Sequence, residues 1–311
     1  MKAPPRKAAV ILGTRASSLA LAQTELIIGL LTAFWPELVC TTRLIETEGD
    51  RTQDSGESLP EIGGKGLFTL ELERALRDGE IDLAVHSLKD LPTEDAEDVV
   101  VAAVAGREDV RDCLVARVGL TLAELSSGTV VGTSSLRREA QLRALRPDLE
   151  IRSIRGNVDT RVRKVLEGEV DAAVLAAAGI ERLGLEHVVT EWLEPEVMLP
   201  APGQGALAIQ CRAGDERVAD LLAAIDDPAS RMTTSAERAF LSALGGGCAA
   251  PVAAHAMLSG DDVRMDALVS SVDGKDVVRV SGVGAPEELG ERLARGALEA
   301  GADRILAAIR G

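Results

Sequence analysis

The 311-residue sequence contains very few aromatic side chains: two Trp, three Phe and no Tyr, together 2% of the chain. Surfaces that bind nucleic acid depend on aromatic stacking and basic charge. This chain instead carries a formal net charge of −16, with a pI near 4.7. Because such a charge repels nucleic acid and anionic membranes, neither is expected as a partner.

Cysteine and histidine are scarce as well, with four and three residues respectively. The cysteines lie far apart and form no Cys-x-x-Cys pair, so neither a metal site nor a disulfide is expected. No apolar run approaches the ~20 residues that a membrane span requires, and the amino terminus is too weakly apolar for a secretory signal. We therefore expect a cytoplasmic protein, with a monomer as the default state.

Two pairs of segments repeat within the chain. LRDGEIDLAV at 76–85 is similar to VLEGEVDAAV at 165–174, and VILGTRASSL at 10–19 is similar to TVVGTSSLRR at 129–138. Each member of the second pair reads as an apolar strand that runs into Gly-Thr and then Ser-Ser-Leu at a helix start. Such a repeat predicts two similar α/β lobes that close around a ligand.

The order of these segments predicts three domains. Lobe 1 combines residues 1–106 and 199–226, lobe 2 spans 107–198, and a C-terminal cofactor-attachment domain spans 227–311. The Pro- and Gly-rich LPAPGQG at the start of the second lobe 1 segment is the expected return crossover. The predicted fold is α/β, with two periplasmic-binding-protein-like lobes joined by a two-strand hinge and followed by a small α+β domain with a three-stranded antiparallel sheet.

Residues 48–66 are polar and rich in Gly, Ser and Asp. A long segment of this kind in a compact domain is either an active-site lid or a surface loop, and composition alone favours neither.

Arginine is concentrated in one part of the sequence. Residues 134–164 hold nine cations against four acids, a local balance of +5 in an acidic protein. Arg137 and Arg138 follow a Gly-Thr-Ser-Ser turn at a helix start, where the helix dipole favours an anion and opposes a cation. The nearby sequence offers these two side chains little structural reason, so we expect a bound polycarboxylate or phosphate. The expected cleft is lined by Arg15, Arg137, Arg138, Arg155 and Arg161.

Two further residues could carry chemistry. Asp90 follows a predicted strand at 81–85, and ligands of α/β sheets bind beyond the carboxyl ends of strands. In a cationic cleft its carboxylate would stay ionised and stabilise positive charge on a reacting ring; the alternative is an ion-paired turn residue. Cys248 follows three glycines, which leave its thiol approachable for a covalent attachment; the alternative is a small core residue. His86 is expected to be a satisfied histidine at a strand end.

Seven stretches, in this order, make the whole chain resemble the porphobilinogen deaminase (hydroxymethylbilane synthase) family. They are TRASSLAL from Thr14, GGKGLF from Gly63, AVHSLKD from Ala84, GTSSLRR from Gly132, RGNVDTR from Arg155, LPAPGQG from Leu199 and the Gly-Gly-Cys that ends at Cys248. The Ala-Ala-Pro after Cys248 and the length of 48–66 depart from the usual family pattern.

The resemblance implies a transferase of tetrapyrrole and heme biosynthesis. Members join four porphobilinogen molecules head to tail on a cysteine-linked dipyrromethane primer, with loss of ammonia, and release hydroxymethylbilane by hydrolysis. The resemblance makes Asp90 and Lys89 catalytic, with Asp90 binding pyrrole N–H groups and stabilising the azafulvene. It assigns the dipyrromethane cofactor to Cys248, Lys89, Asp90, Ser135, Arg137, Arg138 and Arg161. It assigns the substrate to Arg15, Ser17, Asp50, Phe68, Arg155 and Arg182.

Two other functions stay open on the sequence. A non-catalytic receptor for a polycarboxylate explains the repeat and the arginines, but it gives no purpose to Cys248 or to the third domain. An anion-dependent regulator would need a DNA-reading element, and none is visible.

Overall fold

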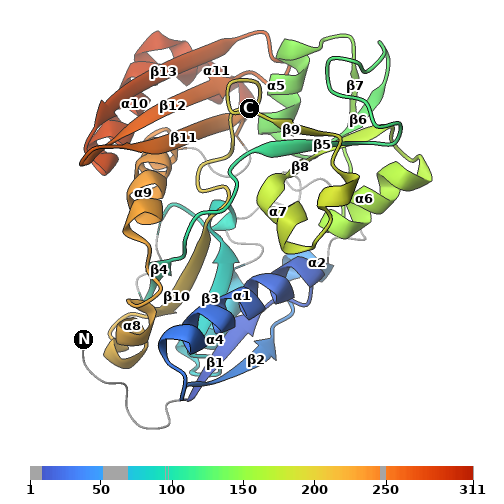
Figure 1. The fold of residues 1–311 in the computed structure, drawn as a ribbon. Helices are drawn as coiled ribbons and strands as arrows, with labels where there is room; N and C mark the ends of the chain where they lie inside the picture. The colour runs from blue at the N-terminus through green and yellow to red at the C-terminus, as the bar shows by residue number, and fades with distance from the viewer. Residues whose placement is uncertain (1–8, 52–68, 95, 97, 246–249, 311) are drawn as a thin grey trace. The chain divides into compact units, whose positions relative to one another are not determined.

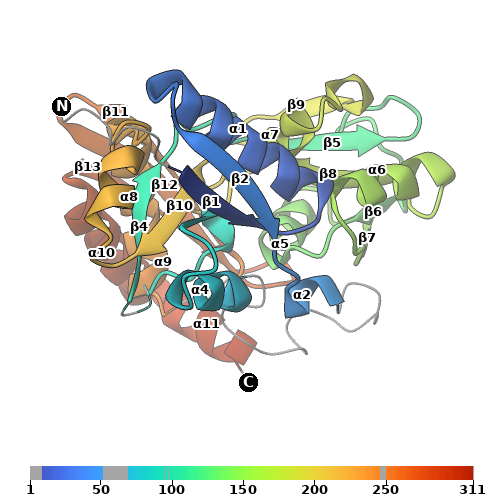
Figure 2. The ribbon, with the colours of Figure 1, turned by 90° about the horizontal axis from the view of Figure 1, so that it is seen from below.

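The computed structural model describes residues 9–51, 69–94, 96, 98–245 and 250–310 (Figures 1 and 2). The chain divides into two compact units, and each is described by itself. The first unit comprises Met1–Arg107 and Ala206–Arg231, and the second comprises Glu108–Gly205 and Met232–Gly311. No helix within the described ranges is long and apolar enough to cross a membrane.

A five-stranded mixed sheet forms the centre of the first unit, in the order β2-β1-β3-β10-β4. Its strands are β1 (Ala9–Thr14), β2 (Val39–Leu44), β3 (Leu83–Ser87), β4 (Val99–Val104) and β10 (Leu207–Arg212). β1 is parallel to β2 and β3, whereas β10 is antiparallel to β3 and β4. The strand predicted just after LPAPGQG therefore rejoins the first sheet, as expected.

Helices cover both faces of this sheet because alternate strand residues point to opposite sides. The helical elements are α1 (Ser18–Phe34), α2 (Glu48–Arg51), α4 (Leu70–Arg77), the 3-10 turn η2 (Leu88–Asp90) and α8 (Glu216–Leu222). α1 and α8 bury Leu31 and Leu222 in one core with Leu12 of β1. α4 buries Leu72 on the other face against Ala84, and Figure 2 shows α1 and α4 on opposite sides of β1.

The second unit repeats this plan, with a mixed sheet in the order β7-β6-β8-β5-β9. Its strands are β5 (Asp112–Ala116), β6 (Val130–Gly132), β7 (Glu150–Arg152), β8 (Ala172–Ala176) and β9 (Glu191–Leu193). Its helical elements are α5 (Leu136–Leu145), α6 (Val158–Glu167), α7 (Ala177–Arg182) and η3 (Glu186–Val188). β6 is parallel to β7 and β8, whereas β5 is antiparallel to β8 and β9. Two sheets of one plan confirm the predicted pair of similar α/β lobes.

The repeated Asp has the same structural role in both units. The carboxylate of Asp82 accepts from the backbone N–H of Ile11 at 2.9 Å, and the N–H of Asp82 donates to Ile11 O at 2.8 Å. Asp171 makes both bonds with Val130, each at 3.0 Å. Each Asp therefore ties the strand that it precedes to the strand that carries the Gly-Thr turn, which explains why the repeat keeps this residue.

A three-stranded antiparallel sheet, in the order β11-β12-β13, forms the C-terminal part of the second unit. Its elements are β11 (Val252–Ser259), β12 (Asp262–Ser270), β13 (Val277–Gly284), α10 (Pro286–Ala297), the π-turn η4 (Leu298–Ala302), α11 (Asp303–Arg310) and the part of α9 (Pro228–Ala243) that follows Arg231. Phe240, Met265 and Leu293 lie in its core. The antiparallel sheet confirms the prediction, and the chain turns between β12 and β13 at Gly274, whose φ is +73°.

Local turns and caps set several element ends. The helical C-terminal segment is interrupted at Gly301, whose φ of +107° no helix accommodates. α9 begins at Pro228, because Asp227 accepts from the N–H of Ser230 at 2.7 Å and Pro is favoured in the first helical turn. β3 begins at Leu83, two residues later than the strand predicted at 81–85. The boundaries of the three predicted domains stay a prediction.

Candidate functional site

The turn after β1 places two of the predicted substrate residues. Ser17 is the N-cap of α1 and accepts from the N–H of Ala20 at 3.3 Å. Arg15 lies in the same turn and is half-buried. Its positive charge is one of the causes that lower the pKa of His86 in the adjacent strand β3.

Lys89 and Asp90 follow β3 directly and form η2. Leu88 and Leu91, on either side of them, are 1% and 3% exposed and anchor the turn in the core. Asp90 is exposed and Lys89 is half-buried, so the turn directs the carboxylate to solvent. This placement beyond the carboxyl end of a buried parallel strand agrees with the predicted site.

His86 is buried, at 6% exposure, near the end of β3, as predicted. The prediction that its ring is satisfied is wrong for Nε2, which is buried without a hydrogen-bond partner among the described residues. Burial is the main cause that lowers the pKa of His86 to about 4; a hydrogen bond with Gln210 opposes it, and the charge of Arg15 adds a smaller lowering effect. The imidazole is therefore neutral at physiological pH.

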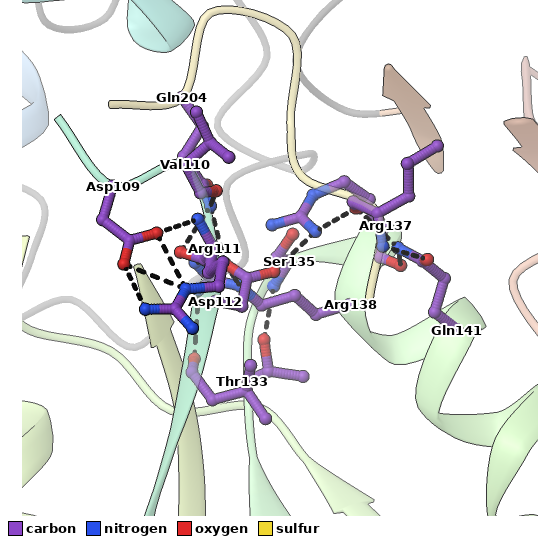
Figure 3. Close-up of polar contacts among 12 residues, drawn as sticks. Asp109, Val110, Arg111, Asp112, Thr133, Ser135, Arg137, Arg138, Gln141 and Gln204 are labelled. Carbon is purple, nitrogen blue, oxygen red and sulfur yellow. Dashed lines mark hydrogen bonds and ion pairs between the residues drawn. The ribbon is translucent and has the colours of Figure 1, made fainter. Parts of the chain in front are cut away.

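In the second unit, Arg137 and Arg138 both bind Asp112 (Figure 3). Arg137 Nη1 donates to Asp112 Oδ2 at 2.7 Å, and Arg138 Nη2 donates to Oδ1 at 2.8 Å. Asp112 is fully buried and each arginine is 5% exposed. Burial would raise the pKa of Asp112, but the two guanidinium charges outweigh burial and hold it well below its usual value.

This ion cluster corrects one step of the sequence argument. We expected little structural reason for the two arginines, and Asp112 supplies one. Asp112 lies in strand β5, 25 residues before Arg137 in the sequence. No periodicity in the sequence links it to the start of helix α5, where the two arginines lie. The only available signal was that it is an acid within an otherwise apolar strand, DCLVA.

The segment after β9 completes the surroundings of the cluster. Arg137 Nη1 donates to the carbonyl of Leu199 at 2.7 Å, and Gln141 donates to the same carbonyl at 3.0 Å. Gln204 donates to Asp112 Oδ1 at 2.8 Å. The predicted crossover LPAPGQG therefore packs on the arginine pair through its polar groups and turns at Gln204, whose N–H bonds to Ala201 O at 3.0 Å.

Ser135 is the N-cap of α5, but its side chain makes no capping hydrogen bond to the helix. Its backbone N–H donates to Thr133 Oγ1 at 3.2 Å instead. The half-buried hydroxyl of Ser135 thus lies at a helix start, one residue from the arginine pair.

Arg155 and Arg161 belong to the loop after β7 and to helix α6. Arg161 Nε donates to the carbonyl of Gly156 at 2.8 Å, which folds the arginine back over the loop. Gly156 has a φ of +109°, and a Cβ there would lie 2.5 Å from Thr160 Cγ2, so only glycine fits this turn. Both arginines are half-buried.

Arg182 has a different environment from the other predicted substrate residues. Its Nε lies 2.6 Å from Glu108 Oε2, and its Nη2 donates to the carbonyl of Gly205 at 2.9 Å. The side chain is 6% exposed, and burial lowers its pKa. These contacts hold together the two ends of the Glu108–Gly205 segment.

Cys248 and Phe68 lie outside the described residues, as does most of the predicted lid at 48–66. Asp50 lies in α2, but its side chain also falls outside the description. No group of His, Cys, Asp and Glu that could hold a metal ion occurs in the part of the chain that the structure describes.

In the second unit, two buried arginines follow β6 and half-buried arginines follow β7, an arrangement typical of an α/β protein that binds an acidic ligand. Residues 10–220 match the family model "Porphobilinogen deaminase, dipyromethane cofactor binding domain", and residues 232–299 match "Porphobilinogen deaminase, C-terminal domain". The chain belongs to the porphobilinogen deaminase family.

Curated relatives support this assignment over nearly the full chain. Porphobilinogen deaminase of Roseiflexus castenholzii is 52% identical over 298 residues, covering 95% of this chain and 98% of its own. Those of Brevibacillus brevis and Deinococcus radiodurans are 46% and 45% identical, covering 96% and 97% of this chain and 96% and 99% of their own. The transferase function and the dipyrromethane cofactor follow from the family, and the receptor and regulator alternatives fall away.

Solved structures of other proteins are similar at a greater distance. The methionine-binding protein MetQ aligns over 70% of this chain and 88% of its own, with 13% identity and a TM-score of 0.44. The effector-binding domain of BenM with benzoate aligns over 70% and 90%, with 14% identity and a TM-score of 0.42.

The arginine cluster fits a cofactor that carries four carboxylates. Two buried guanidinium groups share one carboxylate, which leaves one positive charge without a partner of opposite sign in the cluster. The buried Nε of Arg137 has no hydrogen-bond partner among the described residues. A carboxylate of the cofactor would supply both the missing charge and the missing acceptor.

Proposed function

We propose that this chain condenses four porphobilinogen molecules stepwise on a dipyrromethane held through Cys248 and releases hydroxymethylbilane, with Asp90 as the catalytic carboxylate. When bound, the dipyrromethane supplies the pyrrole carbon to which the first substrate is joined. The observation that carries the proposal is the buried cluster of Arg137, Arg138 and Asp112, whose excess positive charge suits an acidic ligand.

Asp90 has the placement that its role requires. It is exposed at the end of a buried strand, and its turn is fixed on both sides by buried leucines. A fixed carboxylate can accept hydrogen bonds from pyrrole N–H groups and stabilise the positive charge that develops as ammonia leaves, without reorganising during the reaction. Lys89, its neighbour, provides a cation for a carboxylate of the cofactor.

The remaining assignments divide between the cofactor and the substrate. We assign Ser135, Arg137, Arg138 and Arg161 of the second unit to the cofactor. We assign Arg15, Ser17, Asp50, Phe68, Arg155 and Arg182 to the incoming porphobilinogen. Each ring adds two carboxylates, and this accounts for more arginines than one small acid needs. For Arg182, the buried pair with Glu108 supports a role in shaping the site.

Intact mass tests the attachment. The protein purified from a host that makes porphobilinogen should be heavier than its sequence by a two-ring adduct, and Cys248→Ala should have the bare mass and no turnover. Cys40→Ala is the matched control, because Cys40 is a half-buried thiol in β2, and this variant should keep the adduct. A bare mass for the wild-type chain would contradict the proposal.

We also place the chain in the cytoplasm as a monomer that does not bind nucleic acid. The net charge of −16 supports the absence of nucleic-acid binding. Size-exclusion chromatography with light scattering should give a mass near 32.6 kDa; a mass of twice that value would overturn the monomer.

A further inference from the structure

Asp112 lies at the end of the second unit's sheet where α/β proteins bind their ligands. It is the first residue of β5 and pairs with Ala176, the last residue of β8. β8 is parallel to β6, and the helix that carries the arginine pair follows β6. Because β5 is antiparallel to β8, its first residue meets the carboxyl ends of the parallel strands, where α/β proteins bind ligands.

Asp112 engages the two arginines differently. Arg138 donates from Nε and Nη2 to Asp112 Oδ1, at 3.2 and 2.8 Å, and from Nη1 to the carbonyl of Val174 at 3.0 Å. Val174 follows the last residue of β8 that pairs with β6. Arg138 thus extends the hydrogen bonding of the sheet beyond the end of β6, and all three of its nitrogens are engaged within the protein.

Arg137 uses one nitrogen for both of its protein contacts. Nη1 donates to Asp112 Oδ2 and to Leu199 O, each at 2.7 Å. Its Nε is buried and has no hydrogen-bond partner in the described part of the chain. A buried donor without an acceptor is costly, so Arg137 is the member of the pair that is ready to receive a ligand oxygen.

We propose that Asp112 is a positioning residue for cofactor binding: it fixes Arg138 as part of the sheet edge and orients Arg137 so that Nε receives one carboxylate of the dipyrromethane. With two cations and one anion, the cluster keeps one positive charge for that carboxylate. This inference rests on the proposed function.

The test compares the thermal midpoints of cofactor-free and cofactor-loaded protein. Cofactor-free protein is prepared in a host that cannot make porphobilinogen and is loaded with porphobilinogen, with intact mass reporting the adduct. Asp112→Asn should shrink the gap between the two midpoints by at least about 3 °C, because one charge-assisted contact to the cofactor weakens. Arg137→Gln should shrink the gap too, but it should change the cofactor-free midpoint little. In that variant Leu199 O keeps Gln141, and Asp112 keeps Arg138 and Gln204.

Asp82→Asn is the matched control. Asp82 also serves two arginines, accepting from Arg212 at 3.1 Å and from Arg217 at 3.2 Å, but it lies before β3, at the other end of that strand from Asp90. Loss of a purely structural ion pair lowers both midpoints equally, so the gap of Asp82→Asn should stay within about 1 °C of wild type.

If Asp112→Asn does not fold, Asp112→Asn/Arg138→Gln removes one charge of each sign and restores the original net charge. This double variant should fold and show a smaller gap than wild type. An unchanged gap in Asp112→Asn or in the double variant, or in Arg137→Gln, overturns the inference. If the wild-type chain gains no adduct and shows no difference between the two midpoints, the proposed function itself is wrong, so the two failures are distinguishable.

Discussion

The buried imidazole of His86 should make the stability of the first unit fall steeply below neutral pH. Burial lowers the pKa of His86 to about 4 in the folded protein, whereas an unfolded histidine titrates near 6.5. Between these values the unfolded state binds the proton and the folded state does not, so stability is complete above pH 6.5 and is lost as the pH falls toward 4. The two pKa values correspond to a loss of about 2 kcal/mol between pH 7 and pH 5.

The two tryptophans of the chain allow this loss to be measured in the first unit alone. Trp35 is buried there, with its indole N–H donating to Leu221 O at 3.1 Å, whereas Trp192 lies in the second unit. In a Trp192→Phe background, urea unfolding followed by fluorescence therefore reports the first unit. His86→Gln should remove about 2 kcal/mol of the stability difference between pH 7 and pH 5.

His187→Gln is the matched control, because the same substitution there alters an exposed side chain. It should leave the difference between the two pH values unchanged. NMR titration of the His86 ring in the folded protein should give a midpoint near the pKa of about 4. A midpoint close to 6.5, or a His86→Gln variant with the pH dependence of its parent, would refute the reasoning.

Three further predictions follow from the contacts. Asp90→Asn should keep the two-ring adduct mass and lose at least about 100-fold in turnover, measured as hydroxymethylbilane formation, because the amide lacks the negative charge; turnover within a few-fold of wild type would contradict the role. Asp82→Ala should lower the free energy of unfolding, measured with urea, by about 2–3 kcal/mol, because it removes the acceptor of two arginines and of a backbone N–H, whereas Asp171→Ala should lower it by about 1 kcal/mol. Equal losses in the two variants would contradict the explanation that Asp82 stabilises its lobe through the additional arginine contacts. Gly205→Ala should cost at least about 2 kcal/mol, because its φ is +89° and a Cβ would lie 2.6 Å from a backbone carbonyl. Gly214→Ala, at a φ of +81° with open space around it, should cost about 1 kcal/mol.

The fold was largely predictable because its signals are local and repeated. The pairs of similar segments predicted the two sheets, and Asp273-Gly274 is a dipeptide typical of the tight turn that joins β12 to β13. The element ends were less predictable, because side chains from elsewhere in the chain set them. β3 begins after Asp82, whose carboxylate is held by Ile11 and by two arginines of β10 and α8.

The site was predictable only where a motif carries it. Asp90 and the Arg137–Arg138 pair come from short stretches whose turn chemistry is visible in the sequence. Asp112 and Gln204 were missed because each acts through a distant partner: Asp112 binds Arg137, 25 residues away along the chain, and Gln204 binds Asp112, 92 residues away. Such a partnership leaves no period or spacing in the sequence.

The two lobes carry different residues at positions that are equivalent in their shared sheet topology. In the first sheet β10 begins at Leu207, opposite Ser87 at the end of β3; in the second, β5 begins at Asp112, opposite Ala176 at the end of β8. The first lobe buries the apolar side chain of Leu207 at this position. Its Gly-Thr turn carries one arginine, Arg15, and this side chain is half-buried. The lobe with Asp112 can bury two arginines in the equivalent turn, because a buried cation requires a nearby anion. One substitution at the start of an antiparallel strand therefore decides which lobe can hold a dense cationic site, and the Asp112→Asn experiment measures how much of that capacity the carboxylate provides.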